Sequence, residues 1–198
     1  MLSRSIKAPV TAFITPLCKL LIKIGISANA ITIFGTVASV TVSALLIPNG
    51  HLFAASLLIT FFVLFDLLDG TMARLSQRGV SNFGALLDST LDRVADGGLL
   101  LSLAWYLHRE NSSIEALVYL NILLGFLVSY IRARAESLNI ECSGGLAERT
   151  ERLIITLSTI GLAGIGIPYV LALGIWTLFV LSLITVIQRF LIVYRAEH

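Results

Sequence analysis

Charged residues are scarce in this chain, and so are the residues on which sulfur and histidine chemistry depends. Asp, Glu, Lys and Arg make up 13% of its 198 residues, and it has three histidines and two cysteines. Cys18 and Cys142 lie far apart and match no zinc or redox spacing, so we expect both to be ordinary reduced residues. The sequence also has no internal repeat, no low-complexity tract and no polar stretch long enough to form a soluble domain.

Apolar residues, in contrast, are abundant. They make up 57% of the chain, with a mean hydropathy of +0.91, whereas soluble domains rarely exceed about half. This composition predicts an all-α integral membrane protein. Six apolar runs reach the length of about 17–25 residues that crosses a bilayer. The predicted spans are 27–47, 52–74, 83–107, 114–138, 150–167 and 170–192.

The first 25 residues favour a different kind of helix. Lys19 and Lys23 recur at i, i+4 among leucines and an isoleucine, which is typical of an amphipathic helix in the membrane interface. A signal peptide would have an unbroken apolar core and a small-residue cleavage site, and neither is present. We therefore expect a single membrane domain over 1–198, with an interfacial helix at 1–25 and a six-helix bundle at 27–192.

The distribution of lysine and arginine predicts the orientation. With six spans, only Arg109 of the fourteen Lys and Arg residues lies on the face that holds the first, third and fifth connections. The others lie at or near the opposite face, which the positive-inside rule makes cytoplasmic. We expect a multi-pass protein of the plasma membrane with both termini in the cytoplasm.

Four aspartates lie in the stretch 65–93, at the ends of two predicted membrane spans, where placing a carboxylate costs free energy. Asp66 and Asp69 end the second span and Asp88 and Asp92 begin the third, so both pairs are expected near the cytoplasmic surface. An aspartate at the bilayer centre costs roughly 2.5–3.5 kcal/mol. Spacings of three and four residues place each pair on one helix face. Carboxylates at this density suit a hard divalent ion, so the pattern favours a site for two Mg²⁺ ions, with Mn²⁺ possible.

Two other interpretations of these acids stay open from spacing alone. The acids could line a path for ions or protons, which would make the chain a cation channel or transporter. Alternatively, Asp88 and Asp92 could pair with Arg74 and Arg93. Asp96 continues the stripe by four residues, and we expect it to hydrogen-bond the site or an arginine.

The string Asp66-x2-Asp69-Gly70-x2-Ala73-Arg74-x9-Gly84-x3-Asp88-x3-Asp92 resembles the signature of the CDP-alcohol phosphotransferase family. The resemblance implies that the first three aspartates bind two metal ions, and that Asp92 completes the metal site and acts as catalytic base. It also implies contacts to a CDP-lipid from the segment SANAIT at 27–32 and from residues around the signature. The CDP-lipid residues implied in this way are Asn29, Ala30, Ile31, Thr32, Gly70, Arg74 and Ser81.

A second block is similar to one branch of that family, the phosphatidylinositol phosphate synthases. It comprises SYIRARAESL at 129–138, GGLAERTERLII at 144–155 and QRF at 188–190. The resemblance implies transfer of a phosphatidyl group from CDP-diacylglycerol to inositol 1-phosphate (1D-myo-inositol 3-phosphate), and a homodimer. Membrane lipids are further expected partners, and nucleic acid is not. The inositol-phosphate pocket would be formed by Arg132, Arg149, Arg152 and Arg189.

The arginines leave the acceptor open when they are considered by themselves. Arginines from three predicted helices lie at the cytoplasmic level of the aspartates, and this arrangement serves any phosphorylated small alcohol. The alternative enzyme is therefore a phosphatidylglycerophosphate synthase, with glycerol 3-phosphate as acceptor. Arg134 and Arg195 are better explained as anchors to anionic headgroups.

Overall fold

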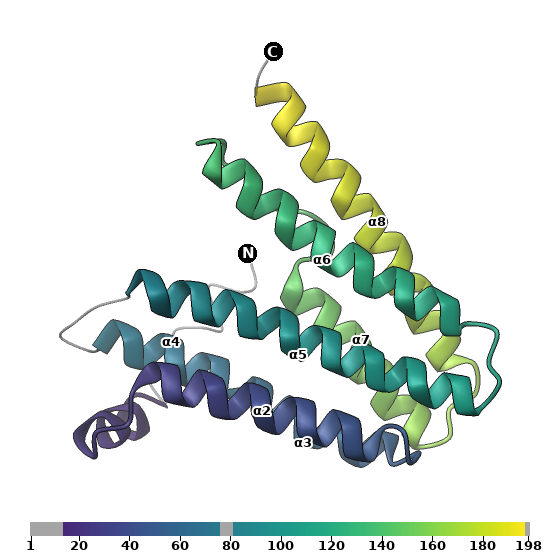
Figure 1. Ribbon diagram of the computed structural model, residues 1–198. Helices are drawn as coiled ribbons and strands as arrows, with labels where there is room; N and C mark the ends of the chain where they lie inside the picture. Colours follow the sequence, from purple (N-terminus) through teal and green to yellow (C-terminus); the bar gives the residue numbers. More distant parts are fainter. Residues whose placement is uncertain (1–13, 76–80, 197–198) are drawn as a thin grey trace. The chain divides into compact units, whose positions relative to one another are not determined.

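The computed structural model describes residues 14–75 and 81–196, with the side chains of residues 66 and 67 outside this set (Figure 1). All regular structure in the described part is helical, as predicted. A helical segment over residues 14–23 comes first. The helices that follow are α2 (Ala28–Leu46), α3 (Leu52–Val63), α4 (Phe65–Leu75), α5 (Asn82–Arg109), α6 (Glu115–Ser137), α7 (Arg149–Gly164) and α8 (Val170–Ala196).

The run predicted as one span at 52–74 forms two helices, with Leu64 between α3 and α4. The Leu64 amide is shared between the carbonyl oxygens of Thr60 (3.3 Å) and Phe61 (3.2 Å). This tightening of the last turn is typical of a helix end. The aspartates of the signature's first half therefore lie on a separate short helix, α4.

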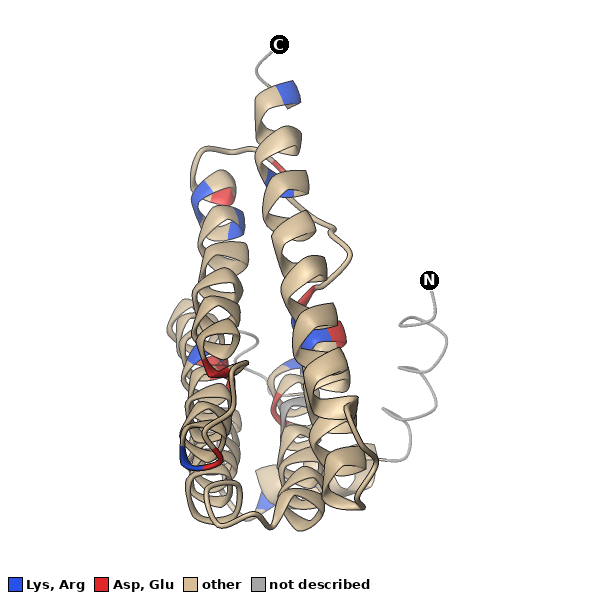
Figure 2. Cartoon of the chain, turned by 90° about the vertical axis from the view of Figure 1, so that its right-hand side faces the viewer, with Lys and Arg blue, Asp and Glu red and all other residues tan. Residues whose placement is uncertain are grey.

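Four stretches of the described chain are long and apolar enough to cross a membrane: Ala28–Leu46, Leu52–Leu75, Glu115–Ser137 and Val170–Ala196. Helix α5 falls outside this group because acids and an arginine interrupt its first half, and α7 because it has 16 residues. Large apolar side chains such as Phe83, Leu173 and Phe190 are exposed along the helices, which suits contact with lipid. Figure 2 shows how sparsely charged residues are placed along these helices. The chain is a multi-pass membrane protein.

The described residues divide into two compact units. The first comprises the chain up to Thr41 together with Leu58–Ala95. Its core includes Cys18, Ile31, Leu68 and Met72, from the segment 14–23, α2 and α4. Burial raises the pKa of the Cys18 thiol, so Cys18 is a neutral packing residue at physiological pH. Both cysteines are free, as predicted, and the structure shows that both are buried.

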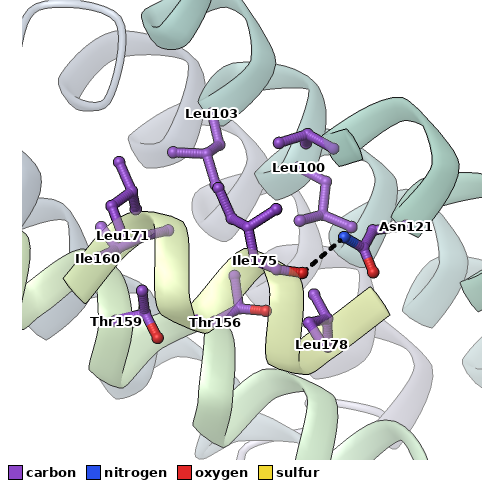
Figure 3. Close-up of a pocket in the computed structure, with 11 residues that line it drawn as sticks. Leu100, Leu103, Asn121, Thr156, Thr159, Ile160, Leu171, Ile175 and Leu178 are labelled. Atoms are coloured by element: carbon purple, nitrogen blue, oxygen red, sulfur yellow. Dashed lines mark hydrogen bonds between the residues drawn. The ribbon is translucent and has the colours of Figure 1, made fainter. Parts of the chain in front are cut away.

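The second unit comprises Val42–Leu57 and the chain from Asp96 onward. Helices α6 and α8 lie side by side in it, and α7 packs against α8 (Figure 1). Asn121 of α6 is buried beside a small, mostly aliphatic cavity between the helices (Figure 3). Its Nδ2 donates to the carbonyl oxygens of Leu117 (3.0 Å) and Ile175 (3.2 Å), which ties α6 to α8.

Two glycines of α7 allow α3 to approach closely within the same unit. A Cβ on Gly164 would lie 2.2 Å from the backbone nitrogen of Phe53, and one on Gly161 would lie 2.9 Å from Ser56 Oγ. Ser56 Oγ donates to the carbonyl oxygen of Leu157 at 2.7 Å. These small residues therefore serve packing between helices inside one chain.

Candidate functional site

The predicted metal-binding aspartates lie on two helices of the first unit. Asp69 is on α4 and is 6% exposed, whereas Asp88 and Asp92 are on α5. Asp88 is exposed, and the Asp92 side chain is 14% exposed. The side chain of Asp66, the first predicted ligand, lies outside the described residues.

Asp69 is held by a hydroxyl group from α2. Thr32 Oγ1 lies 2.6 Å from Asp69 Oδ2 and 3.1 Å from the carbonyl oxygen of Ala28. A hydroxyl carries one proton, and the shorter distance is typical of donation to a carboxylate. Thr32 therefore orients the Asp69 carboxylate, a contact that sequence analysis did not predict.

We expect Thr32→Val to weaken the binding of divalent ions at the predicted metal site. Loss of a group that orients a metal ligand typically costs about 10–100-fold in metal affinity or activity. Titration of activity with Mn²⁺ measures this, and the half-saturating concentration should rise. Thr36→Val makes the same change one turn along α2 and should leave that concentration unchanged. Equal Mn²⁺ titrations for wild type and Thr32→Val would show that the hydroxyl has no such function.

Asp92 has a basic neighbour on its own helix. Arg93 Nη1 lies 3.2 Å from Asp92 Oδ2, so the pairing that was the alternative to a metal site is present for this residue. An ion pair between adjacent residues does not prevent metal binding, because a carboxylate has about four lone-pair sites.

The donor set in this unit suits Mg²⁺ or Mn²⁺. All the predicted ligands are carboxylates, which hard divalent ions prefer. Among the side chains that are described, no group of three or more His, Cys, Asp or Glu residues is arranged to hold a metal ion. Since Asp66 is outside that set, the four-aspartate site stays a prediction.

Two of the predicted CDP-lipid residues, Asn29 and Ser81, lie close to Gly84 where α5 begins. Ser81 Oγ accepts a hydrogen bond from the Gly84 amide at 2.9 Å and caps α5. A Cβ on Gly84 would lie 3.0 Å from Ser81 Oγ and 3.2 Å from Asn29 Oδ1. Glycine at position 84 therefore lets the polar atoms of Asn29 and Ser81 approach the helix backbone closely.

The other predicted CDP-lipid residues differ in their surroundings. Ala30 is exposed, and its amide is capped by Ser27 Oγ at 3.2 Å. Ile31 is 8% exposed and belongs to the core of the first unit, so its side chain packs there. Arg74 is exposed, and its Nη2 donates to Thr71 Oγ1 at 3.2 Å. A Cβ on Gly70 would make only an ordinary contact of 3.7 Å with Arg74 Nη1.

In the second unit, the structure brings two of the four predicted phosphate-binding arginines together. Arg149 Nε lies 3.4 Å from Asp96 Oδ1, and Arg152 Nη2 lies 3.4 Å from Asp96 Oδ2. The expectation that Asp96 contacts an arginine is thus confirmed. Both arginines start from the first turn of α7 and project to the same carboxylate on α5.

Arg189 is occupied by contacts within the chain. It is 2% exposed, its Nε donates to the carbonyl oxygen of Gly144 at 3.1 Å, and its Nη1 donates to that of Val128. Its Nη2 lies 3.6 Å from Glu148 Oε1. Arg189 therefore fastens the segment between α6 and α7 to α8.

That segment needs both of its glycines. Gly144 and Gly145 have φ values of +105° and +130°, a region that side-chain-bearing residues rarely adopt. A Cβ on Gly145 would also lie 2.4 Å from Thr185 Cγ2. The two glycines therefore let this segment turn close to Thr185 of α8.

Arg132 differs from the other three arginines. It is paired with Glu136 one turn along α6, with Nε 2.8 Å from Oε1, and its side chain is 48% exposed.

Three residues around the segment between α6 and α7 were not predicted as site residues: Glu148, Thr185 and Gln188. Thr185 and Gln188 accept hydrogen bonds from the amides of residues 147 and 146. The sequence signals at these two positions were a short polar patch within the last apolar run and, for Gln188, its place in the QRF stretch at 188–190.

Comparison with known proteins identifies the family. Residues 25–194 match the family model described as CDP-alcohol phosphatidyltransferase. A phosphatidylinositol phosphate synthase of Corynebacterium glutamicum is 39% identical over 186 residues, which cover 92% of this chain and 84% of that protein. The chain belongs to the CDP-alcohol phosphatidyltransferase family.

Solved structures of another member of this family agree with the fold. The phosphatidylinositol phosphate synthase of Mycobacterium tuberculosis with CDP-DAG bound has a TM-score of 0.87 and 39% identity, covering 94% of each chain. The same enzyme in complex with manganese and citrate has a TM-score of 0.85 at 39% identity, covering 91% of this chain and 88% of that one. The predicted resemblance is confirmed, and membership of a CDP-alcohol phosphatidyltransferase family makes this chain an enzyme instead of a channel.

Proposed function

We propose that this chain transfers a phosphatidyl group from CDP-diacylglycerol to inositol 1-phosphate, giving phosphatidylinositol phosphate and CMP. The observation that carries the proposal is the identity of about two residues in five with phosphatidylinositol phosphate synthases over nearly the whole chain. The paired arginines on α7 support it, because guanidinium groups bind a phosphate monoester with directed hydrogen bonds.

The four aspartates, Asp66, Asp69, Asp88 and Asp92, would hold two Mg²⁺ ions, with Mn²⁺ as the alternative. Such ions, when bound, offset the charge of the diphosphate and of the leaving nucleotide. The manganese in the relative's structure supports a divalent ion in this family. Thr32 orients the Asp69 carboxylate for this purpose.

Asp92 serves as general base. It takes the proton from an inositol hydroxyl, whose oxygen forms a bond to the phosphorus that carries diacylglycerol. The bond from that phosphorus to the oxygen of CMP breaks, and CMP leaves with the electron pair. Asn29, Thr32, Arg74 and Ser81, with the backbone at Ala30, Ile31 and Gly70, would position the nucleotide and diphosphate.

The acceptor phosphate is bound by Arg149 and Arg152, with Arg132 and Arg189 completing the positive charge. We expect Arg152→Gln to raise KM for inositol phosphate about tenfold or more, because a charged hydrogen bond to the phosphate is lost. Initial rates at varied acceptor, with CDP-diacylglycerol saturating, measure it. If the variant weakens only the use of CDP-diacylglycerol, Arg152 does not bind the acceptor.

The topology belongs to the same proposal. We infer six spans with both termini and the site on the cytoplasmic side of the plasma membrane, where lipid donor and soluble acceptor can both reach it. The excess of arginine at one set of helix ends supports this orientation. In the segment 14–23, exposed Leu17 and Leu20 lie beside exposed Lys19 and Lys23, which suits a helix in the interface.

A homodimer is proposed on the family resemblance. Because Gly161 and Gly164 are used for packing within one chain, a dimer would use other surfaces. The mass of the protein in detergent, measured by light scattering with the bound detergent subtracted, distinguishes one copy from two.

Competition between acceptors tests the function. Purified protein is given CDP-diacylglycerol, Mg²⁺ and either inositol 1-phosphate, glycerol 3-phosphate or free inositol, and CMP release is followed. Release with inositol 1-phosphate, and little with the other two, is the expected result. Preference for glycerol 3-phosphate would make the enzyme a phosphatidylglycerophosphate synthase.

A further inference from the structure

One carboxylate on α5 joins the two arginines of α7. The two oxygens of Asp96 are used separately, Oδ1 toward Arg149 Nε and Oδ2 toward Arg152 Nη2, each at 3.4 Å. Its side chain is 20% exposed, and those of Arg149 and Arg152 are 23% and 10% exposed. These ion pairs are thus partly shielded from water, where charge interactions are stronger than at an open surface.

A shared carboxylate offsets the repulsion between the two arginines. They are three residues apart on one helix face, so their positive charges repel each other. Arg152 has a second fixed contact, because its Nη1 donates to the carbonyl oxygen of Ala147 at 3.2 Å. It also passes close to Gly125, where a Cβ would lie 3.8 Å from its Nε. Arg149 is the more exposed of the two, and an arginine side chain loses much rotamer freedom when it is held in one place.

We propose that Asp96 is a positioning residue of the acceptor site: it holds Arg149 and Arg152 side by side before the phosphorylated acceptor binds. The inference rests on the proposed function, in which these arginines receive the acceptor phosphate. Preorganised donors bind more tightly because the cost of ordering them is already met. Asp96 acts through the arginines and not on the reacting atoms.

The kinetic effect of Asp96→Asn should therefore be confined to the acceptor. We expect KM for inositol 1-phosphate to rise about tenfold, since charge-assisted contacts to both guanidinium groups are weakened. We expect kcat and KM for CDP-diacylglycerol to remain near the wild-type values. Glu115→Gln is the matched control, because it removes the charge of a similarly exposed carboxylate that pairs with His108 at 3.1 Å.

A second substitution separates positioning from general support of the fold. If Asp96 acts through the two arginines, then Asp96→Asn raises the acceptor KM by a smaller factor when Arg149→Gln is already present, because only its contact with Arg152 is left to lose. If Asp96 only supported the fold, the two substitutions would act independently, and their fold-changes in acceptor KM would multiply. Fully multiplied effects, an unchanged or lowered acceptor KM in Asp96→Asn, or a raised KM for CDP-diacylglycerol would each overturn the proposal.

Binding of inorganic phosphate gives a readout that does not depend on turnover. The phosphate concentration that gives half of the maximal thermal stabilisation should be about tenfold higher for Asp96→Asn than for wild type. An equal concentration for the two proteins would overturn the role of Asp96. If wild type releases no CMP with inositol 1-phosphate, the proposed function fails, while this comparison still tests Asp96.

The variant Asp96→Glu guards against misfolding of Asp96→Asn. It keeps the charge and displaces the carboxylate by one methylene group. The acceptor KM and the half-stabilising phosphate concentration should rise less than for a neutral side chain, with KM for the donor unchanged. A rise confined to the donor KM would contradict the proposal.

Discussion

Asp92→Asn is expected to reduce kcat by about 10²–10⁴-fold, the usual contribution of a general base. Asparagine has nearly the same shape as aspartate but cannot accept the proton of the attacking hydroxyl. The side chain is only 14% exposed, and its ion-pair partner is the adjacent Arg93. The fold should therefore survive, and single-turnover release of CMP at saturating CDP-diacylglycerol and acceptor measures the chemical step.

The role of Asp92 as base must be separated from its role as metal ligand. Rates should be measured at Mn²⁺ concentrations that saturate each protein. A variant whose sole defect is weaker metal binding recovers its turnover when the metal concentration is high. Persistent loss of turnover at saturating Mn²⁺ fits a base. Near-normal turnover, or full recovery with metal, would reject that assignment.

Gly164→Ala is expected to destabilise the protein by about 1–3 kcal/mol, as is usual for overpacking. The added Cβ would lie 2.2 Å from the backbone nitrogen of Phe53 and 2.8 Å from its Cα. Backbone atoms cannot move aside by rotating a side chain, so α3 and α7 must separate. The midpoint of thermal unfolding in detergent measures the loss.

Gly97→Ala provides the matched control. Gly97 lies inside α5, and the nearest atoms to an added Cβ are ring carbons of Phe126 at 3.9 Å, an ordinary contact. Alanine there should be neutral or stabilising by up to about 1 kcal/mol, because glycine weakens helix interiors. If both substitutions shift the unfolding midpoint equally, close packing at Gly164 is not the cause.

Helix positions were predictable because they depend on local composition. The apolar runs at 27–47 and 114–138 correspond closely to α2 and α6. The break at Leu64 was not predictable, because its immediate neighbours on both sides are apolar and no proline or glycine marks it; the first acid, Asp66, comes two residues later. It is a property of backbone geometry that composition does not encode.

The types of residue that form the site were predictable from the sequence, but the residues that each of them contacts were not. Asp69 and Thr32 are 37 residues apart in sequence, and Arg152 and Asp96 are 56 apart. No periodicity links such pairs. For Arg189, sequence predicted a phosphate ligand, whereas the structure adds contacts to Gly144, Val128 and Glu148 that hold a loop.

The sequence alone determined that this protein is helical and is embedded in a membrane. It also determined that carboxylates and arginines lie in or near the membrane spans, where their free-energy cost indicates a function. Those conclusions follow from side-chain hydration and helix periodicity, which act over a few residues. Tertiary structure alone decided which hydroxyl orients Asp69, which carboxylate joins Arg149 to Arg152 and which glycines admit a neighbouring helix. These are contacts between distant segments, and packing selects them because each polar atom that leaves water must find a partner.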